Sequence, residues 1–88
     1  MQKITPMEIR FKKELARQVG ETLRKIRVSQ PEKITQADIA DFAEISIRYY
    51  TYLESGERLP SFEVMLKIAK AYDMCISDFC KHFDDINI

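Results

Sequence analysis

Two short helix-forming segments with a very short connection restrict the fold of this chain more than any other feature. The segment 35–43 opens with the letters "TQAD", in which Thr35 can cap a helix and the aspartate three residues later completes a variant of the capping box. The segment 46–55 begins at Ser46, another good cap, and is followed by Gly56, which suits a left-handed helix terminus. The sequence therefore predicts two short helices joined by a sharp turn.

A long helix is expected ahead of this pair. Thr5 can cap it, Pro6 suits its first position, and Glu8 completes a capping box. The helix should end near Val28, because Pro31 lacks an amide hydrogen and restricts the residue before it. Its apolar residues recur at spacings of three and four, as on one helix face. They are Met7, Phe11, Leu15, Val19, Leu23 and Ile26.

The rest of the chain predicts two more helices and no strands. Ser61 is expected to cap a fourth helix and Ser77 a fifth. A chain of 88 residues has room for one core of four or five helices. We therefore expect one all-α domain over residues 1–88, with 1–11 extending the first helix and 84–88 forming a tail. The two short helices and their tight turn indicate a helix-turn-helix at its centre.

Composition argues against membrane and secreted proteins. No apolar run approaches the roughly 18 residues that span a bilayer, and the first residues lack the apolar segment of a secretory signal. The cysteines, Cys75 and Cys80, are too few for a disulfide framework and are expected to be free thiols in a reducing compartment. We therefore expect a cytoplasmic protein without contact to a membrane.

Neither a metal site nor an active site is predicted. Cys75, Cys80 and His82 follow no zinc-binding spacing, and no second pair of ligands accompanies them. Asp84 and Asp85 lie in the expected tail, where they should be solvated. The sequence shows no nucleophile–base pair and no glycine-rich phosphate loop. We expect no enzyme activity, no cofactor and no small-molecule ligand.

Charge is unevenly distributed although the chain is neutral overall. Residues 1–30 contain eight Lys or Arg and three Glu, whereas residues 31–88 contain six Lys or Arg and eleven Asp or Glu. A neutral total can hide a basic face that binds nucleic acid. The same numbers also fit a first helix whose basic side is simply solvated, and the sequence leaves both interpretations open.

Several motifs together resemble the lambda-repressor-like, Cro-type helix-turn-helix family. They are "LRKIR", "TQADIA", the "IS" turn, "YLESGERLPS" and "LKIAKAYDMCISDF", and the resemblance covers about residues 12–83. It implies a compact five-helix DNA-binding domain that acts as a dimer on a palindromic operator. The chain departs from the family at Glu44, because glycine is usual at this turn position. A left-handed non-glycine residue costs roughly 1 kcal/mol, unless the turn relaxes. The connection "VSQPEKI" is longer than usual, which leaves open any phosphate contact from that loop.

The second helix of the motif, residues 46–55, presents two faces when residues are placed about 100° apart around its axis. Tyr50 and Leu53 point inward, Tyr49 lies at the flank, and Arg48 and Tyr52 point outward. The resemblance assigns base reading to five matching positions, which are Ser46, Ile47, Arg48, Thr51 and Tyr52. Arg48 suits guanine and Ile47 a thymine methyl group. Arg48 could instead be solvated, and Tyr52 could touch DNA or only cover the stem of Arg48.

The resemblance also implies contacts with the DNA backbone. Gln36, at the start of a helix, matches a glutamine that the family uses to bind phosphate, and Ser55 and Arg58 follow the reading helix. Arg58 could alternatively pair with its neighbour Glu57. The family further pairs Glu54 with an arginine of the first helix, which is Arg27 here. We therefore expect a partly buried Arg27–Glu54 salt bridge.

The last helix offers a candidate dimer interface. Its apolar positions are Ile76, Phe79, Cys80 and Phe83, and they could either join two copies or close the core of one. We predict a homodimeric regulator of transcription, most simply a repressor, that binds double-stranded DNA. The alternative is a protein-interaction module on the same fold, such as an antitoxin that binds a toxin. Its support is the neutral charge and the tyrosines of residues 46–55, because tyrosine favours protein interfaces.

Overall fold

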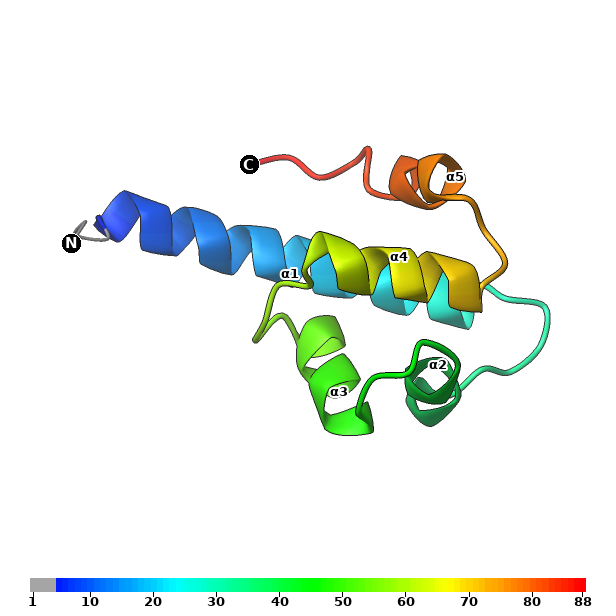
Figure 1. Ribbon diagram of the computed structural model, residues 1–88. Coiled ribbons are helices and arrows are strands. Elements are labelled where there is room, and N and C mark those ends of the chain that lie inside the picture. Colours follow the sequence, from blue (N-terminus) through cyan, green and yellow to red (C-terminus); the bar gives the residue numbers. More distant parts are fainter. Residues whose placement is uncertain (1–4) are drawn as a thin grey trace.

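The computed structural model describes residues 5–88, and within that range it contains five α-helices and no strand (Figure 1). The helices are α1 (Pro6–Val28), α2 (Gln36–Phe42), α3 (Ile47–Ser55), α4 (Phe62–Ala71) and α5 (Ile76–Lys81). Their order and approximate bounds agree with the sequence prediction. Residues 1–4, the first part of the expected N-terminal extension, lie outside the described range.

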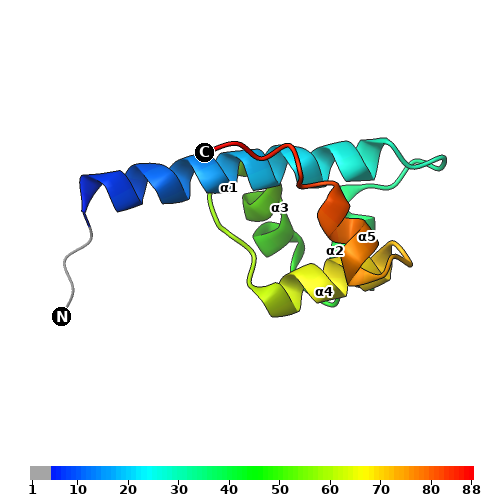
Figure 2. The same cartoon turned by 90° about the horizontal axis from the view of Figure 1, so that it is seen from above.

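The long helix α1 runs along one side of the molecule, and α3 packs directly against it (Figures 1 and 2). Helix α3 packs against both α1 and α2, and α4 packs against α2 and α5. In Figure 1, α2 and α3 lie below α1, whereas α5 and the C-terminal tail lie above it. Buried apolar side chains fill the space between these helices. The largest fully buried ones are Tyr50, Phe79, Leu23, Ile26, Ile39, Leu53 and Ile68.

Side-chain caps fix the starts of four helices. The Thr5, Ser46 and Ser61 hydroxyls each accept a hydrogen bond from the backbone amide three residues ahead, at 3.0–3.1 Å. Thr35 and Asp38 form a reciprocal capping box. The predicted cap at Ser77 is wrong, because α5 starts at Ile76. The Cys75 carbonyl accepts a hydrogen bond from the Phe79 amide at 3.0 Å, which closes the first helical turn. The burial of Phe79 sets the position of this turn, and Ser77 lies inside it.

Two non-glycine residues adopt the left-handed backbone conformation. Glu44 has φ 58°, so the turn between α2 and α3 keeps its shape without the usual glycine. Asp73, with φ 57°, occupies the turn between α4 and α5, and no sequence pattern predicted this conformation. Gly56 ends α3 in the expected left-handed cap, with φ 81°. These turns set the directions in which α3, the following loop and α5 leave their preceding helices.

The C-terminal tail is attached to α1 by the side chain of Gln18. The Gln18 amide nitrogen donates to the Asn87 carbonyl at 2.9 Å, and the Asn87 amide donates to the Gln18 side-chain oxygen at 3.0 Å. Ile86 is partly buried and packs against the core. The tail, residues 84–88, therefore belongs structurally to the domain although its sequence shows no regular pattern.

The apolar stripe predicted along α1 divides into two parts. Val19, Leu23 and Ile26 are buried, but the side chains of Met7 and Phe11 are 75% and 50% exposed. The reason is that the N-terminal turns of α1 project beyond the other four helices (Figure 2), although Ile88 at the C-terminus borders Met7 and Phe11. The apolar face expected along α1 therefore contributes to the core only beyond its first two members.

This division predicts opposite outcomes for two similar truncations. Leu23→Ala should lower the free energy of unfolding by about 3 kcal/mol, because it removes a fully buried side chain and leaves a cavity. Phe11→Ala should change it by less than about 0.5 kcal/mol, because its ring is half exposed beyond the core. Urea unfolding of both variants measures the difference. Equal losses would contradict the projecting position of the first turns.

Candidate nucleic-acid interface

Helix α3 separates a core face from an outward face. Tyr50 and Leu53 are fully buried, and Tyr49 is partly buried against the core. Arg48 and Thr51 are exposed, and Ile47 is 52% exposed at the N-terminal end. Ser46 is exposed as well, but its hydroxyl oxygen already accepts the bond from Tyr49 that caps the helix. The structure thus places the predicted base-reading residues on one accessible surface.

Tyr52 lies beside two arginines on this surface. The Arg48 Nε atom donates a hydrogen bond to the Tyr52 hydroxyl at 3.0 Å, and its guanidinium lies 5.6 Å from the ring centre. The Arg58 guanidinium, from the loop after α3, lies 5.9 Å from the same centre. Among residues 5–88, neither arginine forms a salt bridge with a carboxylate, so Glu57 is not the partner of Arg58.

A hydrogen-bond network beneath this surface joins α2 to α3. The Gln36 amide nitrogen donates to Glu54 Oε1 at 3.0 Å, and the Thr51 hydroxyl donates to the Gln36 side-chain oxygen at 2.9 Å. Both ends of the Gln36 side chain are therefore engaged within the protein. A phosphate contact by this side chain would have to share or replace one of these bonds.

The expected salt bridge between α1 and α3 is present and largely buried. Arg27 donates to both carboxylate oxygens of Glu54, at 2.7 Å and 3.1 Å, and also to the Ile34 carbonyl at 3.0 Å. The two side chains are 16% and 3% exposed. Burial by itself would raise the pKa of Glu54. Hydrogen bonds from Arg27 and Gln36 outweigh that effect and hold the pKa below its usual value. Glu54 is therefore a charged residue that fixes the position of α3.

Comparison with known proteins adds to this geometry. Residues 23–75 match the sequence model of the helix-turn-helix family. The chain belongs to this family. Together with the five-helix arrangement, the match confirms the lambda-repressor-like fold expected from the sequence. The chain is also similar to a protein of Vibrio cholerae serotype O1, the "cryptic phage CTXphi transcriptional repressor RstR", with 46% identity over 46 residues. This similarity covers 52% of the present chain and 41% of the relative.

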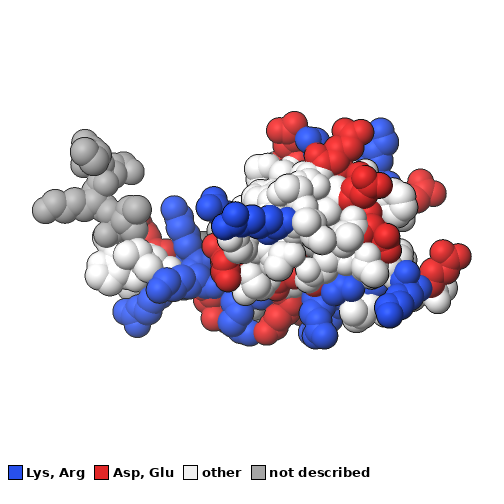
Figure 3. All heavy atoms as spheres, turned by 90° about the horizontal axis from the view of Figure 1, so that it is seen from below, with Lys and Arg blue, Asp and Glu red and all other residues white. Residues whose placement is uncertain are grey.

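Charge on the helix-turn-helix face is divided into regions. Figure 3 views the molecule from below, the side on which α2 and α3 lie in Figure 1. Lys and Arg, with some Asp and Glu between them, line much of the lower margin, and Lys or Arg crosses the left part of a largely uncharged centre. Most of the other Asp and Glu gather at the upper right. The neutral total is therefore not spread evenly over this face.

Ser55 and Arg58 occupy the exposed end of α3 and the loop after it. The Ser55 hydroxyl donates to the Tyr52 carbonyl at 3.1 Å, and the residue remains exposed. Arg58 is exposed beside Tyr52. The Glu57 and Arg58 amides both donate to the Tyr52 carbonyl, at 3.0 Å and 3.3 Å, so the loop folds back over the end of α3. This return brings Arg58 next to the outward face.

Sequence reasoning missed Gly20, at the closest approach of α1 and α3. A Cβ atom at this position would lie 2.5 Å from the Glu54 carbonyl oxygen and 2.6 Å from that of Leu53. No side chain fits there unless the helices move apart. A signal was available, because glycine inside a helix costs about 1 kcal/mol relative to alanine and so usually has a packing reason.

The candidate dimer residues of α5 and the turn after it do not share one environment. Phe79 is fully buried inside the monomer, with its ring 5.3 Å from that of Phe83 at an edge-to-face angle of 62°. Assigning Phe79 to an interface is therefore wrong, because its side chain completes the core. Ile76 and Phe83 are partly buried against the same core, and Cys80 is exposed.

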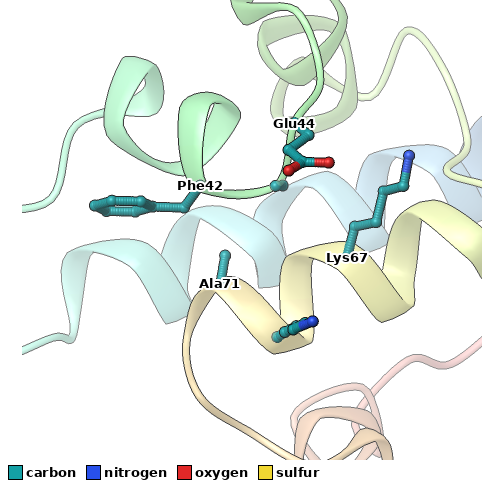
Figure 4. A pocket seen from close by; sticks show the side chains of 6 residues that line it. Phe42, Glu44, Lys67 and Ala71 are labelled. Atoms are coloured by element: carbon teal, nitrogen blue, oxygen red, sulfur yellow. The ribbon is translucent and has the colours of Figure 1, made fainter.

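A shallow hollow lies between the α2–α3 turn and α4 (Figure 4). Phe42 and Glu44 line it from the turn, and Lys67 and Ala71 from α4. Its walls mix apolar groups with charges of both signs and point to no ligand. Over residues 5–88, no group of three or more His, Cys, Asp or Glu could hold a metal ion. No helix in that range is long and apolar enough to cross a membrane.

Proposed function

We propose that this protein is a sequence-specific DNA-binding repressor of transcription that inserts α3 into the major groove. The observation that carries the proposal is the outward face of α3, where Arg48, Thr51 and Ile47 are accessible in a helix-turn-helix domain. In this motif, the N-terminal residues of the second helix contact base edges. The relative from Vibrio cholerae is named a transcriptional repressor, which supports repression over activation.

The chemistry of each residue at or near the outward face of α3 suggests its role. Arg48 binds guanine O6 and N7 bidentately, Ile47 contacts a thymine methyl group, and Thr51 and Ser46 offer hydroxyls. Arg58 and Ser55 bind phosphates, and Gln36 does so by sharing or replacing one of its bonds to Glu54 and Thr51. Such contacts set the register on the duplex without reading sequence. Tyr52 contributes mainly through its two arginine neighbours. Because bacterial and phage operators lie in the cytoplasm, the proposal also places the protein there.

The proposed active form is a homodimer on a palindromic operator. A symmetric dimer presents two α3 helices to half-sites about one helical turn apart, roughly 34 Å. With Phe79 inside the core, Ile76 and Cys80 of α5 and Phe83 of the turn after it remain as the candidate contacts. The simplest mechanism of repression for such a dimer is to occupy the operator. Sedimentation at tens of micromolar, with and without DNA, tests the dimer.

Selection of bound duplexes from a random pool tests the function directly. A palindromic consensus with half-sites one turn apart is the expected result. Enrichment of a single unrepeated site would keep DNA binding and reject the dimer. Failure to enrich any sequence would reject the function and favour a protein-interaction module such as an antitoxin.

The interaction module is supported by the divided charge and the aromatic residues of α3. The positions of the tyrosines weaken that support. Tyr49 is partly buried against the core, and Tyr52 is partly buried beside Arg48 and Arg58. The accessible surface therefore consists mainly of two arginines without a salt-bridge partner among residues 5–88, and not of tyrosine rings, which favours DNA.

Arg48→Ala and Arg58→Ala should weaken operator binding in different ways. Loss of Arg48 should remove about 1–3 kcal/mol of preference at one base pair of each half-site, because a bidentate contact to guanine is lost. Loss of Arg58 should weaken all sequences alike and reduce the salt dependence, because a phosphate contact is lost. Titrations with the consensus and its single-base variants at two salt concentrations measure both effects. Unchanged preference in Arg48→Ala would contradict the proposed placement of α3.

A further inference from the structure

Tyr52 contacts two arginines to which the proposed function gives different tasks. Arg48 comes from the first turn of α3 and Arg58 from the loop beyond Gly56, yet both guanidinium groups lie within 6 Å of one ring centre, at 5.6 Å and 5.9 Å. Cations at this distance over an aromatic ring are attracted to its electron-rich face. Because neither arginine has a salt-bridge partner within residues 5–88, the shared ring is the contact that holds two like charges near each other.

The hydrogen bond to the Tyr52 hydroxyl also orients Arg48. An arginine carries five N–H donors in a planar fork, and here the Nε–H is directed at the hydroxyl oxygen 3.0 Å away. The four N–H groups on the two terminal nitrogens remain for a ligand. Arg48 would then bind guanine through its two terminal nitrogens and not through the edge that contains Nε. The side chain is thus fixed at its stem and free at its tip.

We propose that Tyr52 is a positioning residue that presents Arg48 and Arg58 as one unit, so that base reading and phosphate binding reinforce each other. This inference rests on the proposed function. An exposed arginine loses side-chain freedom when it binds, and a side chain already held in place loses less. Once Arg58 has bound a phosphate, the shared ring keeps Arg48 in place for the adjacent base. Tyr52 itself needs no base contact.

Three substitutions test the arrangement without DNA. Tyr52→Leu removes the ring, and Tyr52→Phe keeps the ring but removes the hydroxyl. Tyr49→Leu is the matched control, because it removes a partly buried tyrosine of the same helix that packs against the core. NMR of the free protein should show ring-current shifts on the side-chain protons of both Arg48 and Arg58. Tyr52→Leu should abolish both sets of shifts, and Tyr52→Phe should move chiefly the Arg48 Nε–H signal. Absence of these shifts in the native protein would overturn the inference.

A double-mutant cycle tests the reinforcement on the selected consensus duplex. In the native background, the double variant Arg48→Ala/Arg58→Ala should lose affinity for the duplex. This loss should be about fivefold smaller than the product of the losses in the two single variants. In the Tyr52→Leu background, the two effects should multiply. Tyr52→Leu alone should reduce the preference at the Arg48-read base pair by about fivefold, whereas Tyr49→Leu should leave this preference unchanged.

The outcomes separate the inference from the function on which it rests. If Tyr52→Leu lowers affinity for every sequence alike, with independent arginine effects in both backgrounds, Tyr52 is an ordinary backbone contact and the inference is wrong. If the native protein selects no duplex, the proposed function fails and the inference fails with it. Ring-current shifts would then show only that the arginines stack.

Discussion

Glu54→Met is expected to lower the free energy of unfolding by about 3–5 kcal/mol, because it leaves a largely buried arginine without its counter-ion. The Glu54 carboxylate is 3% exposed and accepts two hydrogen bonds from Arg27 and one from Gln36. Arg27 is only 16% exposed, so water replaces the lost partner poorly. Urea unfolding at neutral pH measures the loss.

Two controls separate this effect from loss of a charge in general. Glu63 is 80% exposed and lies 3.9 Å from Lys67, so Glu63→Met should change stability by less than about 1 kcal/mol. The double variant Arg27→Met/Glu54→Met should recover much of the loss, because a matched apolar pair replaces a buried ion pair. If Glu54→Met were as mild as Glu63→Met, the bridge would contribute nothing to stability.

The pKa of Glu54 gives the same interaction a dependence on pH. Since its pKa is lowered in the folded protein, the unfolded chain takes up a proton first as the pH falls. The stabilisation by this carboxylate is complete above the ordinary value near 4.5 and is lost as the pH falls through the lower folded value. The stability difference between the native protein and Glu54→Met should therefore shrink only below about pH 4.5.

The sequence predicted the local features that depend on neighbouring residues. Caps at Thr35, Ser46 and Gly56 follow from side chains acting within four residues, and the outward face of α3 follows from helical periodicity. The start of α5 was misplaced, because the burial of Phe79 by distant helices decides it and local capping preference does not. Propensity yields to tertiary packing at such a position.

The contacts that define the candidate site depend on the path of the chain after Gly56 and on how the helices pack together. Arg58 reaches Tyr52 only because the chain reverses at Gly56, and no sequence pattern specifies where the side chain then lies. The bond from Thr51 to Gln36 likewise joins helices whose relative placement depends on the whole core. The Arg27–Glu54 bridge was accessible only through family resemblance, since spacing alone does not connect residues in two separate helices.

Gly20→Ala should lower the free energy of unfolding by about 3 kcal/mol or more, although alanine is the better helix former. The added Cβ would meet two carbonyl oxygens of α3 at 2.5 Å and 2.6 Å. These oxygens belong to the backbone of Leu53 and Glu54 and cannot turn aside as a side chain could. The overlap can be relieved only if α1 and α3 move apart, and this movement loosens the buried packing around Leu53. Helix propensity alone predicts the opposite sign, a gain of about 1 kcal/mol.

The sign of the Gly20→Ala effect in urea unfolding therefore decides between local propensity and helix contact. Gly56→Ala provides a comparison, because its left-handed φ of 81° strains the backbone by roughly 1–2 kcal/mol while the nearest contact, the Arg17 Cα, is 3.0 Å away. A stabilised Gly20→Ala protein would show that α1 and α3 do not approach this closely. If the helices do separate, Glu54 is displaced from Arg27 and α3 loses its fixed orientation. Operator affinity should then fall further than the folded fraction does, because the close contact at Gly20 sets the position of α3 against α1.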